Sequence, residues 1–212
     1  MAGAFDLERN RHGQQRRAGR RSFGSGGTGT IGVLTIPVRE LLRLDRPVLE
    51  RHLLALAAED RRLRFGIALA DSAVRAYVAG VDFERDVVFG AYDESLQLVG
   101  AAHVARAGAH VELGVSVLEG HRDRGIGGAL LERACLRARN WGVRTLFMHC
   151  LRENAPMMRL ARRQNMKIVT EAGEADAWLA LAPADAGSYF GEVFAQRLAL
   201  FDYALKFFSR QT

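Results

Sequence analysis

The stretch that decides the fold reads VELGVSVLEGHRDRGIGGALLERACLRARNWG and spans residues 111–142. In its first part the apolar side chains of Val111, Leu113, Val115 and Val117 recur at every second position, which is typical of a strand. Its last part carries apolar residues at helical spacing, so we expect a helix that ends at a glycine C-cap. A strand, a glycine-rich loop and a helix therefore follow one another here.

The loop in this stretch has the form Arg122-x-x-Gly125-x-Gly127-Gly128. Glycines let a backbone approach a ligand closely, and the first N–H groups of a helix have no intrahelical partners. Because the helix dipole also favours an anion at this end, the loop predicts a pyrophosphate site to which Arg122 and Arg124 add charge. A plain strand-to-helix turn is the alternative for the loop taken alone. The loop does not end in Gly-Lys-Ser/Thr, which excludes a Walker loop, and it lacks the third glycine of a dinucleotide-binding fingerprint.

The rest of the chain alternates between period-two and helical patterns. Strands are expected over residues 34–38, 87–92, 96–104, 145–150, 167–170 and 177–181. Helices are expected over residues 45–57, 71–79, 126–141, 155–164 and 185–208, the first two capped by Asp45 and Asp71. The strand at 145–150 is almost wholly apolar, as expected of one buried on both faces. This order predicts an α/β (α+β) domain with a mixed sheet.

Positive charge is concentrated near the N-terminus. The chain of 212 residues holds 30 Lys and Arg against 24 Asp and Glu, a formal charge of +6, and its isoelectric point is about 10.0. Residues 1–30 carry six arginines and two acids, so four of the six charges lie there. We expect a flexible basic tail over residues 1–30. We therefore expect no nucleic-acid partner, with DNA binding through the tail as the alternative.

The composition excludes several classes of protein. With 49% hydrophobic and 25% charged residues the chain can bury a core, which excludes wholesale disorder and collagen-like repeats. No apolar run reaches the ~18 residues of a membrane span, and the opening residues lack a signal peptide's apolar stretch, so we expect a cytoplasmic protein with no membrane partner. Cys135 and Cys150 form no metal-binding pair, and the spacing of His103, His110 and His121 predicts no catalytic metal.

Together these features resemble the GNAT acetyltransferase superfamily. The resemblance covers residues 32–182 and rests on the strand, the Arg-x-x-Gly-x-Gly loop, the helix, a second strand and Asn154, which opens another helix. It implies the GNAT fold over residues 31–182, a mostly antiparallel sheet of about seven strands flanked by helices. It also implies acetyl-coenzyme A (acetyl-CoA) as the cosubstrate.

The resemblance also implies which groups bind the cosubstrate. Its pyrophosphate would sit on the backbone N–H groups of residues 122–128, Ile126 among them. Its pantetheine arm would pair with the backbone of Val117 and Leu118, where this strand splays from its neighbour. The Asn154 side chain would contact the same arm, and a plain helix cap is the alternative for it.

The implied reaction moves an acetyl group to a primary amine, of a small molecule or of a protein lysine, by direct attack in a ternary complex. The amine must first lose a proton, so a base is required. Glu112 is the expected base, because it is a lone carboxylate on an apolar strand whose partial burial would favour the neutral form. Its spacing of thirteen residues from Gly125 and the segment RLRF at residues 62–65 look like the acetyltransferase module of bacterial protein-lysine acetyltransferases, where the matching Glu is the base. A solvated rim residue is the alternative.

One position departs from the resemblance. Many relatives place a Tyr in the helix after the Asn to protonate the leaving thiolate, and here Ala161 stands in its place. His149 and Cys150 are candidate substitutes, each with a purely structural role as the favoured alternative. An oxyanion donor is expected from a backbone N–H near Val117. A non-catalytic acyl-CoA sensor is the alternative function.

A C-terminal helix over residues 183–212 completes the chain. Phe190, Phe194, Phe201 and Phe208 lie on or near one stripe of it. We expect this stripe to pack on the chain's own domain, with a homodimer interface as the alternative.

Overall fold

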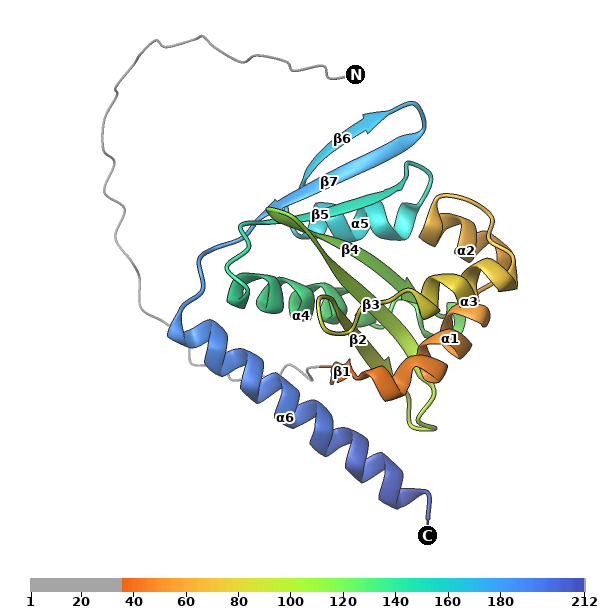
Figure 1. Ribbon diagram of the computed structural model, residues 1–212, viewed down its shortest axis with the longest axis vertical. Helices are drawn as coiled ribbons and strands as arrows, with labels where there is room; N and C mark the ends of the chain where they lie inside the picture. Colours follow the sequence, from red (N-terminus) through yellow and green to blue (C-terminus); the bar gives the residue numbers. More distant parts are fainter. Residues whose placement is uncertain (1–35, 212) are drawn as a thin grey trace. The chain divides into compact units, whose positions relative to one another are not determined.

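The computed structural model of the protein describes residues 36–211 (Figure 1). They contain a seven-stranded sheet with the strand order β1-β2-β3-β4-β5-β7-β6. All neighbouring strands are antiparallel except β4 and β5, which run parallel. The strands are β1 (Arg39–Leu41), β2 (Val87–Tyr92), β3 (Leu98–Ala107), β4 (His110–Val117), β5 (Thr145–Leu151), β6 (Lys167–Glu171) and β7 (Glu174–Ala180). The expected mixed, mostly antiparallel α/β architecture is confirmed. The tail predicted over residues 1–30 lies outside the described residues.

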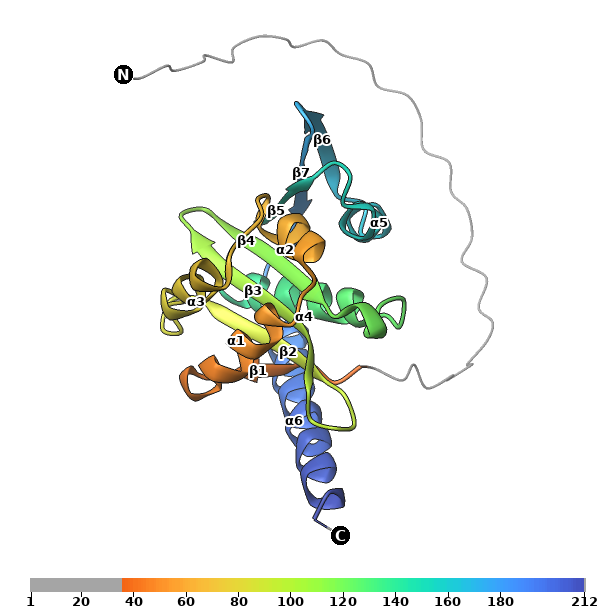
Figure 2. The ribbon, with the colours of Figure 1, turned by 90° about the vertical axis from the view of Figure 1, so that its right-hand side faces the viewer.

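Helices cover both faces of this sheet (Figure 2). They are α1 (Arg46–Leu54), α2 (Ala58–Phe65), α3 (Asp71–Ala79), α4 (Ile126–Asn140), α5 (Ala155–Arg163) and α6 (Ala186–Ser209). α4 packs on β2, β3 and β4, and we call this side of the sheet the α4 face. α1 packs on β3 from the other side together with α3, and we call that side the α1 face.

Residues of β4 alternate between these two faces. Val111, Leu113 and Val115 are buried in the apolar core that includes α4. Glu112 and Ser116 therefore fall on the α1 face, because successive strand residues point to opposite sides. The strand face expected from the alternation of apolar residues is confirmed.

β4 and β5 separate after a short pairing. Val111 pairs with Leu146, and Glu112 pairs with Phe147. Residues 113–117 of β4 stay paired with β3 but no longer pair with β5. α2 contacts both strands. The sheet thus opens into a V at Glu112, and the rest of β4 has one edge with no neighbouring strand.

The N-terminal elements differ from the expectations in two places. The first strand lies at residues 39–41, and residues 36–38 of the strand expected over 34–38 form no strand, since Pro37 has no N–H to donate and pairing with β2 begins at Arg39. Residues 34–35 of that expectation lie outside the described residues. Residues 58–65, which were assigned to no element, form α2. This helix carries five charged residues and two large apolar ones, both in its last turn, so its sequence has little apolar periodicity.

Asp45 is the N-cap residue of α1, as expected, but its side chain makes no capping hydrogen bond, and Asp71 is not the N-cap of α3. The Asp45 carboxylate accepts hydrogen bonds from the Leu42 N–H and from Arg39, each at 2.8 Å, and does not turn towards α1. Ala70 is the N-cap of α3, so Asp71 occupies the first helical position and instead pairs with Arg61.

β5 is buried on one face only. Leu146, Met148 and Cys150 are buried, while Phe147 is half-buried and His149 is exposed. The expected burial on both faces is wrong, because β5 has left β4 after Phe147 and its second face borders the opening of the V.

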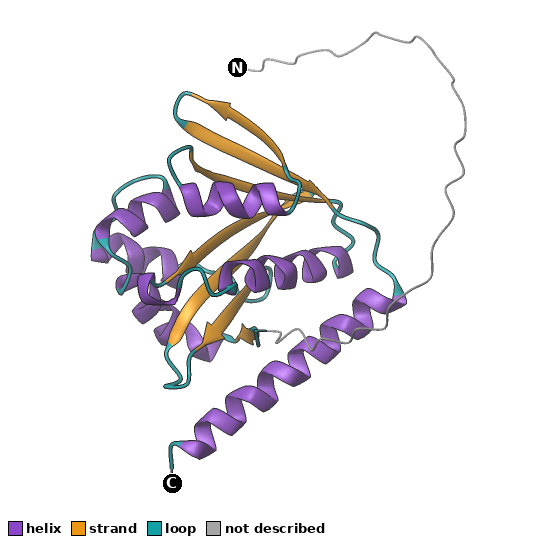
Figure 3. Ribbon diagram, turned by 180° about the vertical axis from the view of Figure 1, so that it is seen from behind, coloured by secondary structure: helices purple, strands orange, loops and turns teal. Residues whose placement is uncertain are grey.

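The stripe of α6 does not pack on its own domain. Phe190 is 74% exposed and Phe208 is 65% exposed, so that expectation is wrong. Figure 3 shows α6 lying alongside α4 and reaching past the sheet towards the C-terminus. Neither α6 nor any other helix within residues 36–211 is long and apolar enough to cross a membrane.

Candidate active site

A cavity of about 190 Å³ lies along the unpaired end of β4. β4 contributes residues 115–117 to its lining, and the glycine loop and the start of α4 contribute the neighbouring wall. α2 and α5 supply the remaining sides. The V between β4 and β5 therefore holds a cleft, as the sequence predicts.

The glycine loop turns sharply before α4. Asp123 and Gly125 both have positive φ, 58° and 86°, a conformation that brings successive backbone N–H groups to one side. Ile126, Gly127 and Gly128 open α4, and in the described part of the chain their N–H groups donate to no acceptor. All three line the cavity, which therefore receives the positive end of the helix dipole.

The three glycines of the loop differ in what an added side chain would meet. Gly125 takes a backbone conformation that disfavours a side chain. A Cβ at Gly127 would lie 4.0 Å from Leu160 Cδ2, so a larger side chain there would extend into the cavity. Nothing lies within 4 Å of a Cβ at Gly128. The space beside these two residues is open for a ligand.

The arginines near the cavity differ in whether they form an ion pair and in whether they line the cavity. Arg159 and Arg163 line it from α5, and neither forms an ion pair within residues 36–211. Arg122 also lines it, but its guanidinium pairs with Asp60 of α2 at 2.6 Å and its Nε donates to the Val117 carbonyl at 3.2 Å. Arg124 is exposed and does not line the cavity. Asp60, which the sequence did not single out, thus holds the loop arginine in place.

Asn154 ties two walls of the cavity together. It is 5% exposed, and its Oδ1 accepts the Met157 N–H at 3.2 Å as the N-cap of α5. Its Nδ2 donates to the Leu63 carbonyl of α2 at 3.1 Å. The interpretation of Asn154 as a helix cap is confirmed. Because it also lines the cavity, its side chain borders any ligand held there.

The two backbone groups expected for the pantetheine arm are placed differently. Val117 lines the cavity. Leu118 does not, and its N–H donates to the Val99 carbonyl at 2.9 Å. Its carbonyl accepts the His121 N–H, also at 2.9 Å, so both backbone groups of Leu118 already have partners and the expectation for Leu118 is wrong.

Glu112 sits at the vertex of the V. It is the last residue of β4 to pair with β5, it is exposed, and it does not line the cavity. The expectation of partial burial is wrong, because the opening of the sheet leaves the α1 face of β4 uncovered at this position. Glu112 therefore lies at the vertex of the V and outside the cavity.

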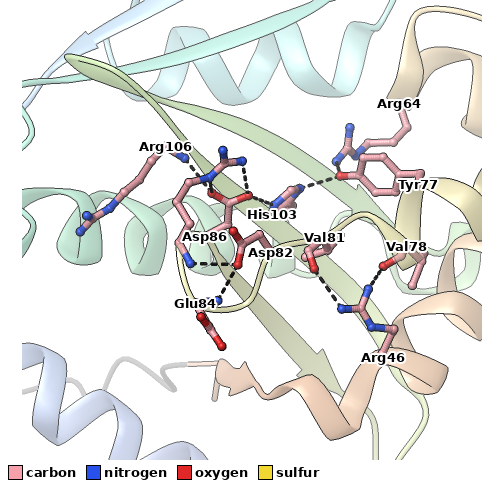
Figure 4. Close-up of polar contacts among 11 residues, drawn as sticks. Arg46, Arg64, Tyr77, Val78, Val81, Asp82, Glu84, Asp86, His103 and Arg106 are labelled. Atoms are coloured by element: carbon pink, nitrogen blue, oxygen red, sulfur yellow. Dashed lines mark hydrogen bonds and ion pairs between the residues drawn. The ribbon is translucent and has the colours of Figure 1, made fainter.

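A polar cluster joins Arg64, Tyr77, His103 and Asp86 (Figure 4). His103 Nδ1 is 2.7 Å from the Tyr77 hydroxyl, and its Nε2 is 3.2 Å from Asp86 Oδ2. The same hydroxyl accepts a hydrogen bond from Arg64 at 3.2 Å. Burial lowers the pKa of His103 and the charge of Arg64 lowers it further, against the opposing pull of Asp86 and Glu112. No local sequence pattern predicts this cluster, because its members come from four separate elements or loops.

Arg64 is the link between this cluster and the cavity. It lines the main cavity and also a second cavity of about 10 Å³, and within residues 36–211 it forms no ion pair. A Cβ at Gly114 would overlap the Arg64 guanidinium, so the glycine lets this cation lie directly on β4. Of the segment at residues 62–65, which the sequence singles out, Leu63 and Arg64 line the cavity.

A buried histidine supports the cavity floor from the α1 face. His52 Nδ1 lies 2.8 Å from the Leu98 carbonyl and its Nε2 lies 2.9 Å from the Ser116 hydroxyl. Burial, with the nearby Arg64 charge, lowers the pKa of His52 to about 4, so the ring is neutral. Ser116 lines the cavity and is held in one orientation by this bond.

The substitutes considered for the missing acid do not reach the cavity. His149 is exposed and lies 2.8 Å from Asp176, while Cys150 is buried and burial raises its pKa. Ala161 is 1% exposed in the core. Among the described residues, His121 is the one histidine that lines the cavity, and its Nδ1 has no hydrogen-bond partner. Structural roles for His149 and Cys150 fit these positions.

The comparisons with known proteins agree with this geometry. Residues 38–166 match the model of the acetyltransferase (GNAT) family. The chain is similar to the GNAT domain of S. lividans PAT, with 22% identity, a TM-score of 0.59, and coverage of 68% of this chain and 89% of that one. It is similar to a GNAT-family acetyltransferase of Staphylococcus aureus (12% identity, TM-score 0.55, coverage 68% and 98%) and to a ribosomal-protein-alanine N-acetyltransferase of Brucella melitensis (20%, 0.52, 68% and 99%). No curated protein matches the sequence.

Proposed function

Because the chain belongs to the acetyltransferase (GNAT) family, we propose that it moves an acetyl group from acetyl-CoA to a primary amine by direct attack in a ternary complex. One observation carries the proposal. The free N–H groups that open α4 meet two unpaired arginines of α5 in a single cleft, beside the unpaired edge of β4. The acceptor class comprises small-molecule amines and protein lysines.

The residues present fit the charges of acetyl-CoA. The N–H groups of Ile126, Gly127 and Gly128 suit a pyrophosphate, because they combine unpaired donors with the helix dipole. Arg159 and Arg163 would hold the 3′-phosphate end, and Arg122 and Arg124 would add charge at the loop. When bound, acetyl-CoA supplies an activated acyl group as a thioester.

The pantetheine arm would follow the unpaired edge of β4. Val117 offers backbone groups there, whereas both backbone groups of Leu118 already have partners. Asn154 would border the arm from the side of α5. The Arg122 side chain occupies the Val117 carbonyl at present, so it would move from that bond when the arm pairs with the strand.

Proton removal from the amine is the first task of the chain's own residues. Glu112 at the vertex of the V would accept this proton as the general base. Arg64 would assist from the cleft wall, since its charge lowers the pKa of His52 and of His103 and would act in the same direction on a bound ammonium group. A larger neutral fraction of the amine would then be ready to attack the thioester carbonyl.

Two further tasks remain for the transfer. A backbone N–H near Val117 would donate to the oxygen on which negative charge develops. The C–S bond then breaks, the sulfur leaves as a thiolate, and water or His121 would return a proton to it. A thiol of ordinary pKa can leave without a dedicated acid, which suits a cavity where Ala161 stands in place of a Tyr.

A second candidate function is a non-catalytic acyl-CoA sensor. It is favoured by the burial of Ala161 in the core and by the exposed position of Glu112 outside the cavity. The sensor would bind acetyl-CoA and release no thiol with any amine.

Thiol release over an amine panel separates the two functions. The panel should contain polyamines, amino acids and lysine-containing peptides, with acetyl-CoA held constant. Catalysis predicts release with at least one amine, and a decrease of about 10²–10⁴-fold in kcat for Glu112→Gln, since that is the usual contribution of a general base. Glu119→Gln is the matched control, because Glu119 is exposed near the same strand but lines no part of the cavity. Equal turnover of the two variants would remove Glu112 as the base.

A further inference from the structure

α6 buries its polar side against the rest of the chain. Glu192 accepts hydrogen bonds from Arg133, at 3.2 Å, and from Arg137. Ser188 is 3% exposed and donates to Asn140 at 2.6 Å, while Lys206 is 9% exposed and donates to the Tyr92 carbonyl at 3.3 Å. The anchored side of α6 is therefore made of polar contacts to α4 and to the end of β2.

Within residues 36–211 the opposite side of α6 is apolar and uncovered. Ten large apolar residues of this helix are exposed, Phe190, Phe194, Phe201 and Phe208 among them, with exposed fractions from 36% to 74%. A surface helix normally points its apolar side inward and its polar side to water, and α6 does the reverse. This arrangement leaves a large apolar face that requires a cover.

The size of this face matches a protein interface. Ten partly exposed side chains of this kind present on the order of 1,000 Å², since a buried aromatic residue accounts for about 150–250 Å². The largest apolar patch of a typical monomer is about 300–600 Å². A standard interface buries about 800 Å² per partner. The face of α6 is thus large enough to form a stable dimer.

The sequence of α6 favours a second copy of the same helix as the cover. Phe190, Phe194, Arg197, Phe201, Ala204 and Phe208 follow one another at spacings of four and three residues. This is the spacing of a helix–helix seam. Arg197, its one charged member, lies two residues before residue 199, the centre of this seam. In an antiparallel pair centred there, Arg197 of each helix would lie opposite Phe201 of the other, where a cation–π contact is favourable, while a parallel pair would set the two arginines side by side.

Other covers fit the observations less well. A helix that lies in a lipid surface has a solvated polar face rich in Lys and Arg, whereas α6 carries two acids and two bases and its polar side is already anchored to the chain. Residues 1–35 contain few large apolar residues, separated by runs of arginine and glycine, so they offer no matching stripe.

We propose that two copies of this chain associate through their α6 helices, packed antiparallel across a two-fold axis. The family match ends at residue 166, before α6, and no residue of α6 lines the cavity. The pairing therefore leaves the cleft open, and it does not depend on the proposed function.

Sedimentation or light scattering of the full chain tests this pairing. The wild type should be a dimer at ten micromolar and above, on the order of the working range of such methods. The double variant Phe194→Glu and Phe201→Glu should be a monomer with an unchanged circular dichroism spectrum and an unchanged thermal shift with acetyl-CoA. Leu44→Glu is the matched control, because Leu44 is 90% exposed outside α6, and it should remain a dimer. A monomeric wild type, or a dimeric double variant, would overturn the proposal.

Further arms keep the test decisive. If the charged pair does not fold, Phe194→Ala and Phe201→Ala should still weaken the dimer by more than tenfold, and an unchanged dissociation constant would count against α6. A chain lacking residues 1–35 should stay dimeric, and loss of the dimer would assign the cover to that segment. Binding of the full chain to vesicles with 30% phosphatidylserine, abolished by the charged pair, would assign it to a lipid surface instead.

Discussion

The two faces of the sheet are built on different principles. On the α4 face, Leu113, Leu130 and Leu146 belong to one apolar core in which they are almost fully buried. On the α1 face, the apolar cluster of α1 and α3 is interrupted by hydrogen-bonded groups, His52 with Ser116 and the set that joins Asp86 to Arg64. The first face fixes where α4 begins and so aims the glycine loop. The second face places charge and hydrogen bonds beside the site where an amine would react.

The largest effect on stability should come from the α4 face. Leu130 is fully buried, and α4 lies so close to β3 that a Cβ at Gly100 would overlap Ile126. Leu130→Ala should lower the free energy of unfolding by about 2–5 kcal/mol, because it removes apolar contacts and leaves a cavity. Chemical denaturation measures this, with the exposed Leu44→Ala as the control at less than about 0.5 kcal/mol. A loss below 1 kcal/mol would show that the α4 face is not the tight core described here.

The α1 face should make stability depend on pH. Because burial holds the pKa of His52 at about 4 while the unfolded chain keeps the ordinary 6.5, only the unfolded chain gains a proton as the pH falls between these values. The free energy of unfolding should therefore keep its full value above pH 6.5 and should decrease by up to about 3 kcal/mol as the pH falls towards 4. Denaturation midpoints at pH 7 and pH 5 measure this.

Two variants check the assignment to His52. His52→Gln should flatten the decrease between pH 7 and pH 5, although its stability at pH 7 will be lower. His149→Asn, at an exposed position, should leave the decrease unchanged. The same decrease in all three proteins would mean that another group is responsible.

A smaller effect is expected from the polar cluster. Tyr77→Phe removes the hydroxyl that joins His103 to Arg64 and should lower the free energy of unfolding by about 1–1.5 kcal/mol. Tyr189→Phe is the control, because Tyr189 is 54% exposed. If the α1 face takes part in amine binding, Tyr77→Phe should also change KM for the amine, while Leu130→Ala should not. Equal kinetics in both variants would mean that the two faces contribute only to packing.

Much of the fold could be predicted from short-range patterns. The alternation in β4, the glycine loop and the apolar row of α4 are local features, and each appears in the structure where the sequence places it. The confirmed strands and helices share this property. α2 escaped prediction because two of its contacts that matter most, Asn154 to Leu63 and Arg122 to Asp60, join residues that are far apart in the chain.

The site was harder to predict than the fold. The exposure of Glu112 depends on where β4 and β5 part, which no local pattern encodes. His52 and Ser116 are 64 positions apart, and Tyr77 and His103 are 26 apart. For α6 the sequence shows the apolar stripe but does not show which side of the helix faces the domain. That side is determined by Glu192 and Lys206, whose partners lie on other elements.

Binding of acetyl-CoA tests the central claim most directly. At 100-fold above its dissociation constant the ligand should stabilise the wild type by about 2.7 kcal/mol, seen as a rise in the thermal midpoint. Gly127→Phe should fold normally and show no rise, because its ring would fill the space beside the free N–H groups of α4. Gly120→Phe, at an exposed position with open space around its Cβ, should behave as the wild type. No rise for the wild type at millimolar acetyl-CoA, or an equal rise for Gly127→Phe, would contradict the account.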